Sequence, residues 1–329
     1  MPLSIEAKKQ FFARNVLYRG TPVSGIDSLI FSVGFESRSR YIFEQCDLDP
    51  NSVLALSYES GRILAFDENL ELARSSKIRF VGERFVDIEK ETTALIADVR
   101  KRHGVLRVGV DVSAMNRSVM AAFLSCLYQH MKPGDRITTL YTPARFRQPD
   151  IPLLPLVSVG PAHPCVSGSI VEPGKSRNLI MGLGYEYGIS LSIIDRHEPD
   201  LAFIFKPIGF DEQYIVEVRD ANFNFDFGDR NYEVIDYRLS DPARLFDDLS
   251  SLINGSLSVA DTVIVPLGPK LFSAISIIVG MIFAPNVPVL RYSMKPANSV
   301  VDVESDGIVS GCEFECLDIK LLDNIIRRD

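Results

Sequence analysis

The chain lacks tryptophan and has only 5 cysteines and 4 histidines, so few side chains are available to form disulfides or to bind zinc. Its 5 cysteines are an odd number at scattered positions, which favours reduced thiols over a disulfide framework. Cys312 and Cys316 lie in CEFECLDI, where alternation predicts a strand, and no second Cys or His pair accompanies them. We therefore expect neither a zinc site nor another resident metal or cofactor.

Long apolar runs and surplus positive charge are also missing. The longest apolar run, Leu271 to Phe283, is shorter than the about 20 residues of a membrane span and predicts a buried helix. The opening MPLSIEAKKQFF has no signal-peptide core and predicts an amphipathic helix over residues 4–16. A net charge of -8 argues against broad binding of duplex nucleic acid. We expect a cytoplasmic protein without a membrane partner.

What is present is a regular alternation of strands and helices. In the first half, predicted strands at 28–33, 52–57, 78–81, 107–112 and 136–141 are separated by helical stretches, among them 63–75, 87–102 and 118–131. Strands that alternate with helices of this length imply a parallel sheet covered by helices. The first half therefore predicts a Rossmann-like α/β unit.

The same order returns after a stretch rich in Pro, Gly, Ser and Val. Predicted strands at 178–183, 262–265 and 287–293, with a helix at 271–283, match strands and a helix of the first half. Gly184-Tyr185-Glu186 repeats the pattern of Gly34-Phe35-Glu36. We predict two tandem Rossmann-like units, each a mostly parallel sheet flanked by helices, related by internal duplication: residues 1–148, a linker at 149–175, and residues 176–329.

The glycine loops are the first candidate site. Gly34 and Gly184 follow the first strand of each unit, where ligands of parallel α/β sheets bind, and Glu36, Arg38 and Glu186 come next. Each glutamate either caps a helix or faces a pocket, where it binds hydroxyls or acts as an acid or base. Neither loop is GxGxxG, so no dinucleotide fingerprint is present.

The second candidate site is a matching pair of elbows where a strand opens a long helix. Ser113, Asn116 and Arg117 occupy the first elbow, and Gly268 and Lys270 the second. Free N–H groups and a basic side chain at a helix start favour an anion such as phosphate. The alternative is that Ser113 and Asn116 are ordinary caps and Lys270 points to water.

Other polar residues are expected on the same rim. Tyr141 and Tyr292 could stack on a base, and Asp111 ends a buried strand, where it either assists catalysis or satisfies backbone N–H groups. Ser113 lacks the flanking glycines of a nucleophile elbow. The rim also contains five further candidates: Arg145, Arg147, Arg291, Lys295 and Asn298.

The elbows VDVSAMNRSVMAA and VPLGPKLFSAIS resemble those of CARF-type domains, the Rossmann-like sensors of cyclic oligonucleotides in prokaryotic antiviral systems. The family's turn is similar to (D/N)-x-(T/S)-G-G-(T/N)-K; its double glycine is missing here, and we expect no effector domain. The resemblance implies two halves paired around one nucleotide-like ligand.

Three functions follow as alternatives. The first is a nucleotide- or oligonucleotide-binding regulatory or accessory protein in antiviral defence, with a phosphorylated ligand between the halves and a protein partner in a defence complex. The second is a nucleotide- or nucleoside-processing enzyme that uses Glu36 or Glu186 as acid or base, with Asp111 in support. The third is a structural subunit of a larger complex with a vestigial pocket. The sequence does not decide whether the protein is an enzyme.

Overall fold

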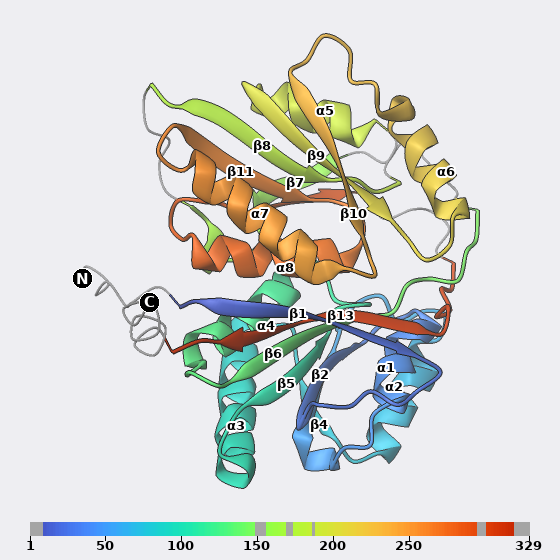
Figure 1. The fold of residues 1–329 in the computed structure, drawn as a ribbon. Coiled ribbons are helices and arrows are strands. Elements are labelled where there is room, and N and C mark those ends of the chain that lie inside the picture. Colours follow the sequence, from blue (N-terminus) through green and yellow to red (C-terminus); the bar gives the residue numbers. More distant parts are fainter. Residues whose placement is uncertain (1–8, 149–155, 169–173, 186–187, 295–300, 319–329) are drawn as a thin grey trace.

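The computed structural model describes residues 9–148, 156–168, 174–185, 188–294 and 301–318. The chain has an α/β fold with two Rossmann-like units, each built on a largely parallel sheet with helices on both faces (Figure 1). Between the two sheets lies a layer of helices that belongs to both units.

The first sheet has seven strands in the order β1-β13-β6-β5-β2-β3-β4. The five strands from β6 to β4 are parallel, and β13 and β1 extend the sheet antiparallel. The strands are β1 (Phe11–Arg19), β2 (Ser28–Val33), β3 (Val53–Ser57), β4 (Arg79–Val81), β5 (Arg107–Asp111), β6 (Arg136–Tyr141) and β13 (Ile308–Cys316).

The second sheet has four parallel strands in the order β10-β9-β8-β11. A single parallel bridge, Ile264 to Val289, leads from β11 toward a two-stranded antiparallel sheet of β12 and β7. The strands are β7 (Leu156–Pro161), β8 (Ser176–Gly182), β9 (Leu201–Ile208), β10 (Tyr232–Arg238), β11 (Ala260–Pro266) and β12 (Leu290–Met294).

The helices form three layers around the sheets. One face of the first sheet carries α1 (Tyr41–Glu44) and α2 (Phe66–Ser75), and the outer face of the second carries α5 (Ile189–His197) and α6 (Gln213–Ala221). The shared central layer consists of α3 (Phe85–His103), α4 (Arg117–His130), α7 (Pro242–Ser256) and α8 (Lys270–Ile282). One continuous hydrophobic core surrounds these four helices, because α4 packs on α8 and α7 packs on β1 and β13.

Both units have the same order of matching strands. Beginning with the strand that precedes the glycine loop, β2, β3, β4 and β5 lie as β5-β2-β3-β4, and β8, β9, β10 and β11 lie as β11-β8-β9-β10. The predicted strands and long helices are confirmed with small shifts at their ends. Whether the two units arose by internal duplication stays a prediction.

The predicted N-terminal helix is wrong over the part that the structure describes. Residues from Phe11 onward form β1, which pairs with β13 along its whole length. Apolar residues occur at spacings that suit a helix, but pairing with a strand about 300 residues away supplies the backbone hydrogen bonds instead.

The expected domain boundaries also differ from the strand pairing. β13 belongs to the first sheet, although the sequence predicts residues 176–329 to form the second unit. The expected linker, 149–175, contains β7, which pairs with β12 of the second unit. Both differences come from antiparallel pairs between distant segments, which local periodicity does not reveal.

Among the described residues, no helix has both the length and the apolar character needed to cross a membrane.

Candidate functional site

The Gly34–Arg38 loop follows β2 and holds a buried ion pair. Glu36 precedes a short 3₁₀ helix, Ser37–Arg40, but its side chain makes no capping hydrogen bond. Instead its Oε2 accepts from Nε of Arg38 at 2.7 Å, with 19% of the Glu36 side chain and 11% of the Arg38 side chain exposed. Burial opposes the charge on Arg38, yet Glu36 and Tyr141 raise its pKa above the ordinary value. The guanidinium therefore stays charged.

Arg38 links this loop to the ends of β5 and β6. Its Nη1 donates to the Thr142 carbonyl at 3.3 Å, and its side chain also bonds to the Tyr141 hydroxyl. The Thr142 N–H donates to Ser113 Oγ at 2.9 Å. Burial raises the pKa of Tyr141, partly offset by Arg38. Three strand ends of the first unit thus meet at Arg38.

Asp111, the last residue of β5, is fully buried beside this cluster. Its Oδ1 accepts from the Ser113 N–H at 2.9 Å, whereas its Oδ2 has no partner among the described residues. Burial raises the pKa of Asp111 to about 7, although Ser113 and Arg38 act in the opposite direction. The carboxyl group satisfies one backbone N–H, in line with one of the two interpretations of the sequence.

The elbow after β5 begins α4 and reaches the second unit. Asn116 is a true cap, because its Oδ1 accepts from the Val119 N–H at 2.9 Å. Arg117 is the first residue of α4, and its Nε donates to Ser273 Oγ of α8 at 3.1 Å. This contact joins the two units directly.

The matching elbow after β11 requires glycine at one position. Gly268 has a φ of +69°, and a Cβ there would lie 1.8 Å from the Leu183 carbonyl oxygen. The elbow therefore lies against the chain between β8 and the Gly184 loop. Lys270 follows as the first residue of α8, the position that Arg117 has in α4.

Aromatic residues of the second unit complete the site. The Tyr214 hydroxyl on α6 contacts the carbonyl oxygens of Ala144 and Arg145 at 3.3 and 3.1 Å, beyond the end of β6. Its ring centroid lies 5.0 Å from Phe146 and 5.6 Å from Tyr185. Burial, followed by the influence of Tyr141, raises the pKa of Tyr214 to about 12. Tyrosines of both units therefore lie within electrostatic range of one another.

Two buried asparagines that sequence reasoning missed hold the glycine loops. Nδ2 of Asn69 in α2 donates to the Gly34 carbonyl and to Ser39 Oγ, both at 2.9 Å. Nδ2 of Asn222, after α6, donates to the Gly184 carbonyl at 2.9 Å, and its Oδ1 accepts from Ser190 at 2.9 Å. Asn69 and Asn222 hold equivalent loops of the two units, and this equivalence is recognised only after the units are aligned strand by strand.

The predicted site residues fall into separate groups. A first-unit cluster contains Gly34, Glu36, Arg38, Asp111, Ser113 and Tyr141. Asn116 and Arg117 lie at the start of α4, and Gly184, Gly268 and Lys270 belong to the second unit. Tyr292 lies elsewhere: it is buried against the α5 side and its hydroxyl is 2.7 Å from Nε2 of His197. Glu186, Lys295 and Asn298 lie outside the described residues.

Two of the outer arginines are engaged in local contacts. Arg145 forms an exposed ion pair with Glu304 at 2.8 Å, and Arg291 donates to Ser293 Oγ at 2.5 Å. Within the described ranges, no group of three or more His, Cys, Asp or Glu side chains could hold a metal ion. A cavity of about 520 Å³ lies at β10 and α7, and none of the predicted site residues lines it.

Comparison with known proteins adds little to this geometry. No family model matches the chain. No curated protein matches it. Among solved structures, a putative universal stress protein from Pseudomonas aeruginosa UCBPP-PA14 is 10% identical and has a TM-score of 0.25, over 82% of this chain and 94% of that chain. A C2-type ketoreductase from a modular polyketide synthase is 12% identical with a TM-score of 0.21, over 80% of this chain and 64% of that chain. At these TM-scores neither structure indicates a function, and the CARF resemblance stays a prediction.

Proposed function

We propose that this protein binds a phosphorylated nucleotide or oligonucleotide at the carboxyl ends of the strands, where the two units meet. The observation that supports this most is the convergence of Arg38 and Tyr141 from the first unit with Tyr214 from the second. In parallel α/β sheets, ligands usually bind beside the carboxyl ends of the strands.

The residue types at this edge suit the two parts of a nucleotide. Arg117 and Lys270 open the two facing helices α4 and α8, where N–H groups and cationic side chains together favour phosphate oxygens. The Tyr214 ring contacts the rings of both Phe146 and Tyr185, and these rings offer faces on which a base can stack. A regulatory role in antiviral defence, with a protein partner, rests on the CARF resemblance alone.

Direct binding tests the proposal. Purified protein is titrated with fluorescently labelled ATP and with a labelled cyclic oligoadenylate, followed by fluorescence anisotropy. The double variant Arg117→Gln/Lys270→Gln is expected to bind at least tenfold more weakly, because two cationic contacts to phosphate are lost. Arg219→Gln is the matched control, since Arg219 is an exposed residue of α6 paired with Asp220. Equal affinity in the double variant and the control, at equal thermal stability, would refute the proposal.

Asp111 favours a second candidate, an enzyme that acts on a nucleotide or nucleoside. Its pKa of about 7 and its Oδ2, unbonded among the described residues, are the properties of an acid–base group at neutral pH. Glu36 is less suited to act as an acid or base than the sequence suggested, because its carboxylate already forms an ion pair with Arg38. Turnover of a nucleotide panel that is lost in Asp111→Asn, with binding retained, would distinguish the enzyme from a binding protein.

A further inference from the structure

The second sheet ends in an open edge at β10. This strand pairs with β9 over 7 residues in unbroken register, and no described strand lies on its other side. At the two ends of β10, the Asn231 carbonyl and the Leu239 N–H both bond to β9. The backbone groups of a strand alternate between its two sides, so those of Val234 and Asp236 point outward. They are the groups to which a further strand would bond.

Other edge strands have features that hinder the addition of a strand, and β10 has few of them. β4 is only 3 residues long, and β7 pairs with β12 through a register shift. The Asn15 side chain of β1 bonds to Asp241 and to the Ala243 N–H at the start of α7, so α7 covers part of that edge. Short strands, irregular pairing and covering elements all protect an edge. β10 is longer than β4, regular and without proline.

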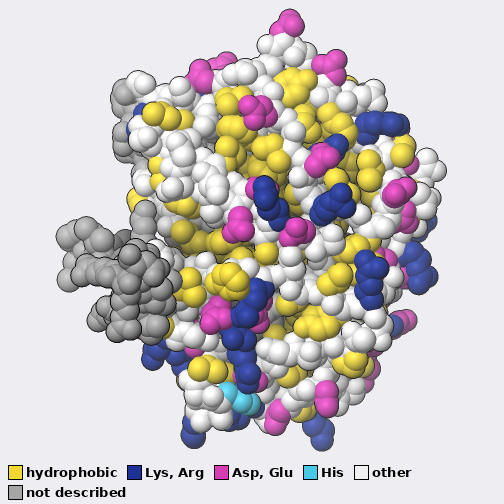
Figure 2. Space-filling model, in the orientation of Figure 1, with side chains coloured by type: hydrophobic (Ala, Val, Ile, Leu, Met, Phe, Trp, Pro, Cys, Tyr) yellow, Lys and Arg dark blue, Asp and Glu magenta, His cyan; other side chains and the backbone are white. Residues whose placement is uncertain are grey.

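The charged residues of β10 are balanced. Asp236 pairs with Lys206 of β9 at 2.8 Å, which leaves Glu233 and Arg238 as one charge of each sign. Figure 2 shows acidic and basic side chains next to one another over α7 and β10, among hydrophobic ones. No surplus charge at this edge therefore repels an added strand, and none selects an anion or a cation.

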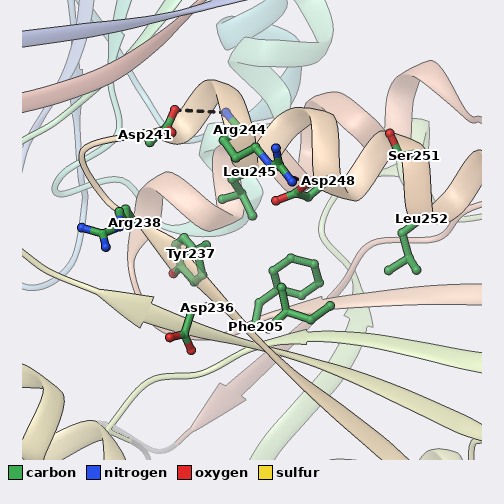
Figure 3. A pocket seen from close by; sticks show the side chains of 11 residues that line it. Phe205, Asp236, Tyr237, Arg238, Asp241, Arg244, Leu245, Asp248, Ser251 and Leu252 are labelled. Atoms are coloured by element: carbon green, nitrogen blue, oxygen red, sulfur yellow. Dashed lines mark hydrogen bonds and ion pairs between the residues drawn. The ribbon is translucent and has the colours of Figure 1, made fainter.

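A cavity of about 520 Å³ borders this edge, between β10 and α7 (Figure 3). It touches four consecutive residues of β10, from Ile235 to Arg238, whose side chains alternate between the two faces of the sheet. A space in contact with both sets reaches the open side of the strand. The side chains of Asp236 and Arg238 point away from the apolar lining, which comes from β9, β10 and α7: Phe205, Ile235, Leu245 and Leu252.

The α7 wall of the cavity is a single stripe of the helix. Leu245 and Leu252 form its apolar part, and Arg244 and Asp248, which pair at 2.8 Å, form its rim. Asp241 accepts from the N–H of Arg244 at 3.4 Å and caps the helix, where the dipole favours its charge. An edge strand and a helix stripe thus enclose an apolar groove whose rim charges are matched.

We propose that an extended, uncharged segment of a partner protein adds to β10 as a fifth strand of the second sheet and places apolar side chains in this cavity. In strand addition, backbone hydrogen bonds provide affinity and a pocket for alternate side chains provides specificity. Val234 and Asp236 supply the first, and the groove between β10 and α7 supplies the second. The proposal does not depend on the nucleotide site.

A second copy of this chain suits the groove less well than a separate segment. If β10 of another copy paired with this edge, its side chains on the α7 side would be Ile235 and Tyr237. Both already pack in the core of their own unit, and Tyr237 is 4% exposed. They are therefore not available to fill the cavity of the neighbouring copy.

A phage-displayed library of random peptides, selected on the full chain, supplies the probe for the test. Enriched peptides are expected to carry large apolar residues at every second position and no charge at those positions. The most enriched peptide, labelled with fluorescein, is titrated by fluorescence anisotropy. Leu252→Trp, which fills the cavity, is expected to weaken it about tenfold or more.

A pair of variants at Val234 tests the backbone contact. Val234→Pro removes one outward N–H at an exposed edge position, so it is expected to weaken the peptide about tenfold or more. Val234→Thr keeps that N–H and the branched side chain, and should change affinity by less than about twofold. In wild type, hydrogen exchange at Val234 and Asp236 should slow when the peptide binds, whereas exchange in β4 should not change.

Three results would overturn the proposal. The first is a library that enriches no peptide. The second is equal peptide affinity in wild type, Val234→Pro and Leu252→Trp at equal thermal stability. The third is a dimer, measured by light scattering, that dissociates in Val234→Pro, because this would assign the open edge to a second copy of the chain.

Discussion

At the scale of single residues, Asp111 makes stability depend on pH. Its pKa is about 7 in the folded chain and 3.8 is its ordinary value, so the folded state holds the proton more tightly than the unfolded state. The associated stability is fully present below pH 4 and is lost as the pH rises through 7. We expect Asp111→Asn to flatten this part of the profile by about 1 to 4 kcal/mol.

Thermal unfolding of wild type and Asp111→Asn between pH 4 and pH 8 measures the effect. The difference in melting temperature between variant and wild type should grow in favour of the variant as the pH rises. Parallel pH profiles for the two proteins would show that Asp111 keeps an ordinary pKa.

Gly268 provides a second prediction at this scale. Its φ is +69°, and the Leu183 carbonyl oxygen lies 1.8 Å from the position that a Cβ would take, which leaves no room for a side chain. We expect Gly268→Ala to lower the free energy of unfolding by about 2 kcal/mol or more, measured by urea denaturation. Gly255→Ala in α7 is the control, because a Cβ there meets open space and alanine favours a helix by about 0.5 to 1 kcal/mol. Equal effects of the two substitutions would contradict this account of the elbow.

At the scale of elements, the buried asparagines should determine how firmly the glycine loops are held. Asn69→Ala removes hydrogen bonds to the carbonyls of Gly34 and Glu36 and to Ser39. We expect a loss of about 1 to 3 kcal/mol and faster amide hydrogen exchange in the loop after β2. Asn51→Ala, at an exposed position, should change stability by less than about 0.5 kcal/mol. Unchanged exchange in the Asn69 variant would mean that the loop is held by its other contacts.

Elements of the βα alternation could be predicted because their signals are local. Hydrophobic patterns over short stretches of sequence predict the apolar strands before Gly34 and Gly184 and the long helices α4 and α8. β1 and β7 could not be predicted in the same way, because each depends on a partner strand far along the chain. An edge strand with one exposed face can show the same apolar spacing as an amphipathic helix.

The candidate site was predictable only in part for the same reason. Strand ends gave Arg38, Ser113 and Tyr141, which the structure brings together. Tyr214 lies on a helix of the other unit, and its approach to the end of β6 depends on how the units pack. Glu36 forms an ion pair with Arg38, two residues further along the chain. The position of Glu36 in the sequence does not show whether its carboxylate forms this ion pair or caps the helix.

At the scale of the whole molecule, the shared core predicts that the two units unfold together. Phe314 of β13 is 1% exposed and packs edge-on against Phe246 of α7, with ring centroids 5.2 Å apart. We expect Phe314→Ala to cost about 3 to 5 kcal/mol and to shift a single calorimetric transition to lower temperature. Phe12→Ala, 52% exposed on β1, is the control and should shift it little. Two transitions, of which only one moves, would show that the units are energetically separate.

β13 fills the place between β1 and β6, although these two strands precede it by roughly 300 and 170 positions. During synthesis on a ribosome, the first five parallel strands can assemble early, but the gap beside β6 closes only after residue 316 has left the exit tunnel. The nascent chain therefore carries an open sheet margin from the emergence of β6, which ends at Tyr141, until β13 has emerged, and the second unit is made before the first is finished.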